Sequence, residues 1–324
     1  MLDLHRLRLL RELKHRGTLA AVAAALSYSP SSISQQLSVL EQEAGVPLLE
    51  PVGRRVRLTA QAEILVAHTE AVLERLERAE ADLAASLEGI SGVLRVAAFQ
   101  TAALALVPAT LTRLREAHPG LRVEITQTEP ETALPALVAR DFDLVIAEEY
   151  PDDPAARPAE IEQAELCRDE LRLAVPRSAL RRLDGPGASL ERLADHPWVM
   201  EPAGTASRRW ATTLCRRAGF EPDVRFESTD LLLHLRLVEE GHAAAFLPDL
   251  VWDGRTASVA LRPLPEEQGV RRLFTAVRRG SGRHPAVRAY RDALLAAAEA
   301  RTRPRMWGGG GRFRGWERPP EGLD

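Results

Sequence analysis

One predicted helix, which begins at residue 30, presents a face that can exchange hydrogen bonds but carries almost no charge. Its outer face holds hydroxyl and amide side chains at helical spacing: Ser31, Ser34, Gln35, Ser38 and Gln42. Its inner face is apolar, with Ile33, Leu37 and Leu40. A merely solvated helix usually carries Glu and Lys on its outer face. Hydroxyl and amide groups on a helix can instead pair with base edges in the major groove of double-stranded DNA, whose width admits a helix.

The residues before this helix predict a helix-turn-helix. Gly17 ends a first helix, and Thr18 is a hydroxyl N-cap for a second helix over residues 19–26, whose apolar positions form one stripe. After a short turn, Ser29 caps the next helix and Pro30 fills its first position, where a missing N–H costs nothing. The alternative is an Ala-rich antiparallel helix pair whose polar face is only solvated.

A basic turn follows at residues 51–57, with Arg54, Arg55 and Arg57 and no acidic residue. Arginines in such a turn bind phosphates, which gives affinity and register on DNA but carries no sequence information. Residues 1–58 have a net charge of +3, from eight Lys or Arg and five acids, although the whole chain has −3. The rest of the chain is therefore near −6, as expected of a DNA-binding segment attached to another domain.

The segment 59–88 contains no Gly or Pro and predicts one long helix. A heptad repeat gives it a narrow apolar seam with two rows: Ala62, Thr69, Leu76 and Leu83 in one, and Leu65, Val72, Ala79 and Ser86 in the other. Charged residues cover the remaining faces, which favours pairing with a second copy over packing on its own domain. A dimer would place two reading helices on two half-sites, so a partly palindromic operator follows from symmetry.

Beyond a hinge at residues 89–92, strands and helices alternate. The first unit has strands at 94–98, 123–127 and 143–147 and helices at 104–116 and 132–140. This order predicts a parallel sheet with right-handed crossovers. A second unit has strands at 171–175, 198–200, 224–227 and 243–247 and helices at 205–218 and 231–240. A strand at 271–277 and a helix at 284–299 complete the pattern.

Composition argues against several other classes of protein. No apolar run approaches the ~20 residues of a membrane span, and the charged start of the chain, 1–13, does not resemble a signal peptide. Only two cysteines occur, Cys167 and Cys215, which predicts a reducing cytoplasm rather than a disulfide framework. A redox-sensing pair is the alternative. Catalytic motifs such as GxSxG, HExxH and Walker sequences are absent, and the histidines are scattered, so we expect no enzyme, cofactor or metal.

Taken together, the chain from about residue 4 to 298 resembles the LysR-type transcriptional regulators of bacteria. The pattern is carried by Leu4, Leu7, Leu10, Gly17-Thr18-Leu19, Ala23 to Leu26, Ser29-Pro30-Ser31-Ser32-Ile33-Ser34, Leu40-Glu41, Gly45-Val46-Pro47-Leu48-Leu49-Glu50 and Leu58-Thr59. Three residues depart from it: Pro51, Leu49 and Ala62 stand where the family usually has arginine, phenylalanine and glycine. An arginine missing from the wing should remove one phosphate contact.

The resemblance implies an α+β multidomain fold. An all-α winged helix-turn-helix over 1–58 precedes a linker and dimerisation helix over 59–88, and a two-lobed α/β domain of the periplasmic-binding-protein type covers 92–300. Lobe one comprises 92–166 and 268–300, and lobe two comprises 167–267. The tail, 301–324, is rich in Gly, Pro and Arg and is expected to be disordered; a weak nucleic-acid-binding tail is the alternative.

Residues and resemblance together assign two sets of contacts. For DNA they are Thr18, Ser29, Pro30, Ser31, Ser32, Ser34, Gln35, Ser38, Arg54 and Arg55. For a small-molecule effector, in a crevice outside the carboxyl ends of the strands, they are Gln100, Thr101, Thr128, Glu148, Glu201, Thr205, Thr229 and Phe246. Thr205 and Thr229 precede helices and could simply cap them. If two or more loop acids face the crevice, the effector should carry an amine or guanidinium, and a zwitterion would also suit a helix N-terminus.

The sequence thus predicts a cytoplasmic transcriptional regulator that binds an operator as a homodimer or homotetramer, is switched by a small molecule, and does not contact a membrane. The alternative from another class is an α/β solute-binding or enzyme-like protein whose N-terminal helices mediate protein contacts.

Overall fold

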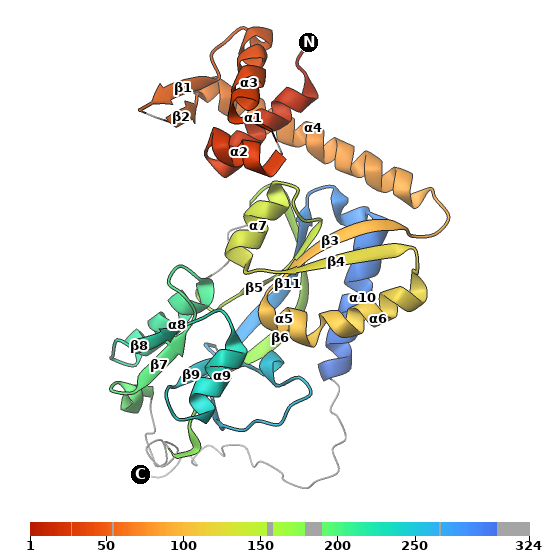
Figure 1. Ribbon diagram of the computed structural model, residues 1–324. Helices are drawn as coiled ribbons and strands as arrows, with labels where there is room; N and C mark the ends of the chain where they lie inside the picture. Colours follow the sequence, from red (N-terminus) through yellow and green to blue (C-terminus); the bar gives the residue numbers. More distant parts are fainter. Residues whose placement is uncertain (27, 54, 154–157, 179–189, 266, 303–324) are drawn as a thin grey trace, which may run out of the picture.

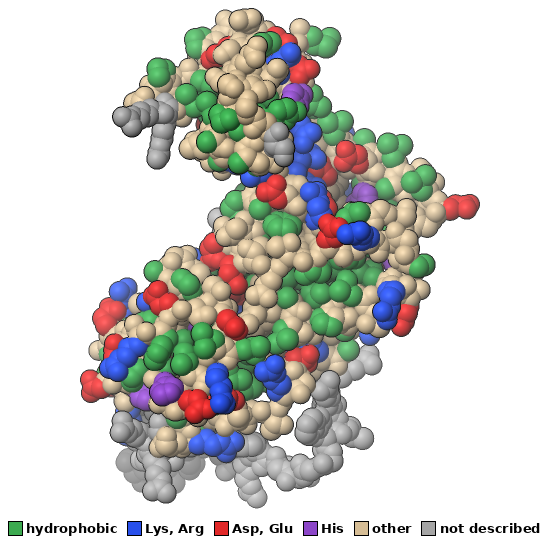
Figure 2. Space-filling view, viewed as in Figure 1, with side chains coloured by type: hydrophobic (Ala, Val, Ile, Leu, Met, Phe, Trp, Pro, Cys, Tyr) green, Lys and Arg blue, Asp and Glu red, His purple; other side chains and the backbone are tan. Residues whose placement is uncertain are grey.

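The computed structural model describes residues 1–26, 28–53, 55–153, 158–178, 190–265 and 267–302. A small N-terminal domain stands at one end of the molecule, and the long helix α4 leads from it to a larger two-lobed α/β domain (Figure 1). The space-filling view shows basic side chains gathered where the N-terminal domain meets the larger one (Figure 2).

The N-terminal domain is a winged helix-turn-helix. Its elements are α1 (Leu4–Arg16), α2 (Leu19–Leu26), α3 (Pro30–Ala44), β1 (Leu49–Val52) and β2 (Arg55–Leu58). The predicted helix ends are confirmed: Gly17 terminates α1 in the left-handed conformation, with φ 75°. The Oγ of Ser29 accepts a 3.1 Å hydrogen bond from the Ser32 N–H, and Pro30 begins α3.

The core of this domain comes from the predicted apolar faces. Ile33, Leu37 and Leu40 of α3 are buried against Val22 of α2 and Leu10 of α1. β1 and β2 form an antiparallel hairpin, so the basic turn is a two-stranded wing. Gly53 at the tip of the wing has φ 63°, a conformation that suits glycine.

Helix α4 runs from Ala60 to Ala85 and is capped by Thr59, whose Oγ1 accepts from the Ala62 N–H at 3.2 Å. One face packs on the same chain: Ala62, Val66, Thr69, Leu73, Glu77 and Ala81 are buried. The prediction that Ala62 and Thr69 face a partner helix is therefore wrong. A straight α-helix drifts by ~20° per heptad relative to a 3.5-residue repeat, and α1 covers that side of α4.

The first lobe is built on three parallel strands. Before the chain passes to the second lobe, the elements of this lobe are β3 (Gly92–Ala98), α5 (Gln100–Ala105), α6 (Val107–Ala117), β4 (Leu121–Gln127), α7 (Pro130–Val138) and β5 (Leu144–Glu149). β3 pairs in parallel with both β4 and β5, as the sequence predicts. In the described part of the chain the whole seven-stranded sheet is mixed, with the order β10-β6-β11-β5-β3-β4 and β9 beside β6, because β11 is antiparallel to β5 and β6.

Two long strands carry the chain between the lobes: β6 (Ile161–Val175) and β11 (Val270–Arg278). The remaining elements are η2 (Leu190–Leu193), β7 (Pro197–Met200), α8 (Ala206–Arg217), β8 (Asp223–Glu227), α9 (Leu231–Glu239), β9 (Ala245–Pro248), η3 (Asp249–Trp252), β10 (Ala260–Pro263), η4 (Ser281–Arg283) and α10 (Pro285–Thr302). The predicted strand at 171–175 is only the end of β6. The earlier part, 161–170, is not predicted from the sequence because it is rich in charged side chains and lacks an apolar run. Residues 301 and 302, assigned to the disordered tail, are helical; 303–324 lie outside the described residues.

Candidate DNA interface and effector cleft

The outer face of α3 is exposed, as predicted. Ser31, Ser34, Gln35, Ser38 and Gln42 all lie on the surface. In Figure 2 the surface over α3 is mostly tan, the colour of uncharged polar side chains and backbone. This face therefore offers hydrogen-bonding groups and little charge, as base-edge recognition in a groove requires.

The orientation of α3 is fixed from α1. The Arg6 guanidinium donates to Gln36 Oε1 at 3.1 Å and to Glu43 Oε1 at 2.7 Å. Two other predicted DNA contacts have local roles: Thr18 Oγ1 accepts from the Ala21 N–H at 3.1 Å, and Ser29 caps α3. Their hydroxyls help to position the helix ends. Ser32 is half-buried, whereas Ser31 is exposed.

The wing offers less free positive charge than its sequence predicts. Arg57 pairs with Glu50 across the hairpin at 2.6 Å, with both side chains on the surface. Arg54 lies outside the described residues, as does the side chain of Arg55. Pro51 is exposed on β1, so the family's arginine at this position is replaced by a surface residue without charge.

A buried charge cluster occupies the junction of the two lobes. Arg271 of β11 is 1% exposed, and its guanidinium donates to Asp169 Oδ2 of β6 at 2.7 and 3.0 Å. It also forms an ion pair with Glu148 at the end of β5 and donates to Thr101 Oγ1 at 2.7 Å. Its carboxylate neighbours raise the pKa of Arg271 despite its burial. Two predicted effector residues, Thr101 and Glu148, are thus brought together by an arginine.

The sequence pattern does not single out Arg271 or Asp169 as residues of the cleft. Arg271 lies on the face of its strand that also carries Leu273 and Val277, both fully buried. An arginine on the buried, apolar face of a predicted strand does indicate a buried ion pair, since buried charges require partners. The partner Asp169 is 102 residues away in the sequence, and no local pattern connects the two.

Three carboxyl groups crowd this junction. Burial, followed by the proximity of Glu148, raises the pKa of Glu201 to about 8 and that of Glu129 to about 7. Burial also raises the pKa of Glu148, against the opposing effect of Arg271, and the Tyr150 hydroxyl donates to Glu148 at 3.0 Å. Arg271 is shared by Glu148 and Asp169, so it cannot neutralise all of these acids.

Three hydrogen bonds, made by Gln100 and Glu131 of lobe one, link the lobes across the cleft. Gln100 of lobe one accepts the Leu231 N–H at 2.6 Å and donates to Asp230, at the N-terminus of α9. Glu131 of α7 accepts the Ala206 N–H of α8 at 2.6 Å. The N-terminus of α8 therefore already holds a carboxylate in this conformation.

The two threonines that precede helices behave differently. Thr205 caps α8: its Oγ1 accepts from the Arg208 N–H at 3.2 Å and donates to the Pro202 carbonyl at 3.0 Å. Thr229 does not cap α9, because Asp230 accepts the Leu232 N–H at 2.9 Å instead. Thr229 is half-buried beside that cap.

The last two predicted effector residues lie on opposite lobes. Phe246 stacks on Trp198 with ring centroids 5.0 Å apart and meets Trp210 edge-on at 5.2 Å. It walls a hollow of about 30 Å³ that Tyr150 and Glu201 also line, which has room for roughly one or two waters. Thr128 is half-buried, and its N–H donates to the Ala98 carbonyl at 3.1 Å.

Comparison with known proteins decides the family. Residues 4–63 match the bacterial regulatory helix-turn-helix of the lysR family, and residues 87–299 match the LysR substrate binding domain. The chain is 30% identical over 311 residues to the probable HTH-type transcriptional regulator LrrA of Synechococcus elongatus, covering 92% of this chain and 98% of that one. This protein belongs to the LysR family of transcriptional regulators.

This LysR-type regulator is also similar to a second curated regulator and has the same fold as two solved structures. The transcriptional dual regulator GltC of Bacillus subtilis is 25% identical, covering 76% of this chain and 81% of its own. A full-length OxyR variant from Pseudomonas aeruginosa has the same fold, with a TM-score of 0.62 at 21% identity, over 91% of this chain and 95% of that chain. The structure of full-length CbnR in complex with its target DNA matches with a TM-score of 0.51 at 23% identity, over 92% of this chain and 100% of that chain.

The cysteines of this LysR-type regulator are poorly suited to thiolate chemistry. Both are free; burial raises the pKa of Cys167 on β6 to about 11 and that of Cys215 on α8 to about 12. Since the thiolate is the reactive form of cysteine, these raised pKa values disfavour the reactive form at both residues. Among the described residues, no group of three or more His, Cys, Asp or Glu is placed to hold a metal ion. No described helix has the length and apolarity to cross a membrane.

Proposed function

We propose that this LysR-type regulator reads a partly palindromic operator as a homodimer or homotetramer and is switched by a small molecule bound between its two lobes. The observation that carries the switch is the buried junction of Arg271, Thr101 and Glu148, with Glu129 and Glu201 beside it. This junction lies at the carboxyl ends of parallel strands, where open α/β sheets bind ligands.

The exposed face of α3 supports the proposed DNA contacts. Gln35 and the serines around it supply base-edge contacts, whereas Arg54 and Arg55 of the wing supply phosphate contacts. Residues 1–58 act as the DNA-binding domain, 59–88 as the linker, and 92–300 as the effector domain. In the effector domain, 92–166 and 268–300 form lobe one, and 167–267 form lobe two. The chain regulates transcription rather than catalysing a reaction, and reading a bacterial operator places it in the cytoplasm, away from membranes.

An apolar stripe on α4 supports the oligomer. Val72, Leu76 and Leu83 project from α4 and are 44%, 39% and 69% exposed. Exposed apolar side chains aligned on one helix face are typical of an interaction surface. A second copy of α4 would cover this stripe while the adjacent face of each helix, which carries Val66, Leu73 and Ala81, stays packed on its own chain.

The crowded carboxyl groups favour an effector with a positively charged group. An amine or guanidinium near Glu201 would relieve the cost of burying these acids together. If the effector is a zwitterion, its carboxylate would replace Glu131 at the N-terminus of α8. Binding would then change lobe closure and hence the spacing of DNA-binding domains in the oligomer.

A thermal-shift screen of the full chain with small polar metabolites tests the effector site. A ligand should raise the melting temperature with concentration, as linkage requires, and Thr101→Val should abolish that rise. Removal of the hydroxyl leaves one Arg271 N–H without its partner, so the variant itself should be less stable by ~1–3 kcal/mol. The ligand-induced shift is therefore the quantity to compare, with exposed Thr112→Val as the matched control. Normal shifts in both Thr101→Val and Thr205→Val would place the site elsewhere.

A further inference from the structure

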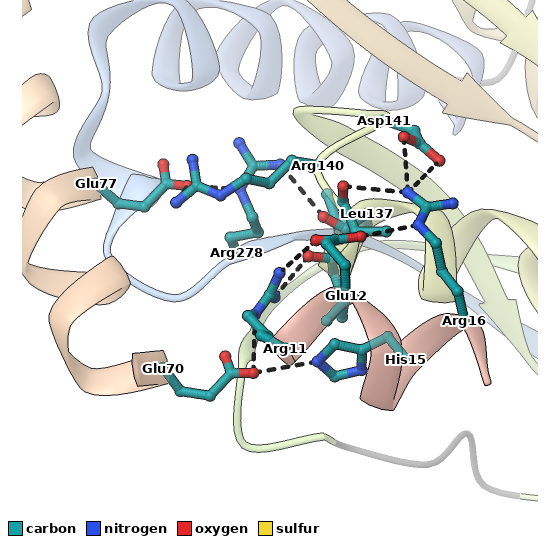
Figure 3. Close-up of polar contacts among 12 residues, drawn as sticks. Arg11, Glu12, His15, Arg16, Glu70, Glu77, Leu137, Arg140, Asp141 and Arg278 are labelled. Atoms are coloured by element: carbon teal, nitrogen blue, oxygen red, sulfur yellow. Dashed lines mark hydrogen bonds and ion pairs between the residues drawn. The ribbon is translucent and has the colours of Figure 1, made fainter. Parts of the chain in front are cut away.

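The winged helix-turn-helix contacts lobe one of the same chain through α1. Arg11 of α1 is only 3% exposed, and its guanidinium donates to the Val138 carbonyl at the end of α7 at 2.6 Å. The same guanidinium donates to Glu70 of α4 at 2.9 Å and to Glu12 at 3.1 Å. Figure 3 shows Arg11 and Arg16 pointing from α1 toward the chain that follows α7. Arg11 thus joins three parts of the molecule.

Arg16, more than one turn further along α1, makes a second set of contacts to lobe one. Its Nη2 donates to both carboxylate oxygens of Asp141, at 3.1 and 3.2 Å, and its Nε donates to Glu12 at 2.8 Å. Glu12 is itself 3% exposed and is shared by Arg11 and Arg16. One acid therefore holds both guanidinium groups in place against lobe one.

Helix α4 is attached to the same segment from the other side. Arg278 of β11 donates to Glu77 of α4 at 2.6 Å and to the carbonyls of Leu137, at 3.3 Å, and Phe142. Arg140 pairs with Glu77 at 3.0 Å. Residues 137–142 and their neighbours thereby contact both α1 and α4.

The chemistry of this segment explains why arginines gather on it. The last carbonyls of a helix have no partners within the helix and carry its partial negative charge. Arg140 follows the end of α7 in the left-handed conformation, with φ 68°, which turns the chain away from the helix axis. The Val138 carbonyl accepts from Arg11, and the Leu137 carbonyl, which also accepts the Arg140 N–H at 3.1 Å, accepts from Arg278.

We infer that residues 137–142 form an intramolecular docking site for the winged helix-turn-helix, which fixes the recognition helix α3 relative to the effector domain. Three buried or half-buried arginines, Arg11, Arg16 and Arg278, hold the docked arrangement. Displacement of the docked domain would leave buried guanidinium groups without their partners, which is unfavourable in free energy. The exposed face of α3 stays free in the docked arrangement.

Helix α7 also connects this docking site with the cleft. It begins at Pro130, directly after Glu129, and Glu131 in its first turn binds α8 of the other lobe. A single nine-residue helix therefore touches lobe two at its start and the DNA-binding domain at its end. Displacement of α7 by a ligand would move the docking site. This last step rests on the proposed effector function; the docking itself does not.

Distance measurement between two spin labels on the full chain tests the docking. Labels at the exposed positions Gln42→Cys of α3 and Glu124→Cys of β4, with Cys167 and Cys215 replaced by alanine, report the domain orientation. Labelled chain is diluted into excess unlabelled chain, so that each oligomer contains at most one labelled copy. Docking predicts one narrow distance distribution that matches the separation in this structure.

Two variants then break the docking site from opposite sides. Asp141→Arg places like charges against Arg16, and Arg11→Met removes the contact to Val138; each should broaden the distribution and add other distances. Asp223→Arg, which breaks an exposed 2.8 Å pair with Arg225 in lobe two, is the matched control and should leave it narrow. Circular dichroism melting shows that each variant is folded, and Arg16→Ala replaces any that is not.

A broad distribution in the parent chain would overturn the inference, as would a narrow one at a different distance. An unchanged narrow distribution in both docking variants would do the same. Neither an operator nor an effector enters the measurement, so its outcome is independent of the proposed function.

Discussion

At the scale of single residues, Gln35 and Arg54 separate sequence reading from phosphate binding. Gln35→Ala should weaken binding to the operator by ~1–3 kcal/mol and leave binding to random DNA almost unchanged, because its amide reads a base edge. Arg54→Ala should weaken both alike and lower the salt dependence by roughly one unit of slope. Fluorescence anisotropy titrations at several salt concentrations measure both effects. Equal losses on the two DNAs for Gln35→Ala would exclude α3 as the reader.

The carboxyl crowding at the lobe junction makes stability depend on pH. The pKa of Glu201 is raised to about 8, mainly by burial, so between pH 4.5 and 8 this carboxyl group binds more protons in the folded chain than in the unfolded one. The contribution of this group to the free energy of unfolding therefore falls as pH rises through that window.

Glu201→Gln should remove that loss of stability. We expect the variant to unfold at a higher denaturant concentration than the parent at pH 8, with a gain of about 1.4 kcal/mol for every tenfold change in the proton affinity of Glu201 on folding. The two proteins should differ little near pH 4.5. The exposed Glu221→Gln serves as the control, since Glu221 pairs only at the surface with Arg216. A pH-independent difference in stability between Glu201→Gln and the parent would contradict a raised pKa of Glu201.

At the scale of elements, the exposed stripe of α4 makes the oligomer testable. Leu76→Asp should place like charges opposite each other across a two-fold axis, where they are neither paired nor well hydrated. Sedimentation at micromolar concentration should then show a monomer, with operator affinity reduced. Leu87→Asp, at a residue that is 68% exposed beyond the end of α4, should remain oligomeric. An unchanged sedimentation profile for Leu76→Asp would remove α4 from the interface.

Elements also show which features of the fold follow from local sequence. Gly17, Ser29 and Pro30 set helix ends through contacts within a few residues, so those ends are predictable. The acidic partners of Arg271, Asp169 and Glu148, lie 102 and 123 residues away, and their meeting depends on how β5, β6 and β11 pair. The effector residues Thr101 and Glu148 are predictable from strand ends, but the arginine between them depends on the tertiary fold.

At the scale of the whole molecule, the two functional ends of the chain are joined by structure rather than by a free linker. Helix α4 packs on α1 at one end and lies beside η4 of the effector domain at the other. The arginines of α1 meet the end of α7 as well. A ligand in the cleft and an operator on α3 would thus act on one connected set of elements, which is the condition for coupling between two sites.

Selective DNA binding by the full chain is the decisive property of the proposed regulator. The purified protein is mixed with fragments of its own genome, bound fragments are recovered by gel shift, and the strongest is footprinted. We predict enrichment of specific fragments, protection of two half-sites related by a two-fold axis about 10 base pairs or a multiple apart, and loss of that selectivity in Gln35→Ala. Uniform, sequence-independent binding, or no binding at all, would contradict it.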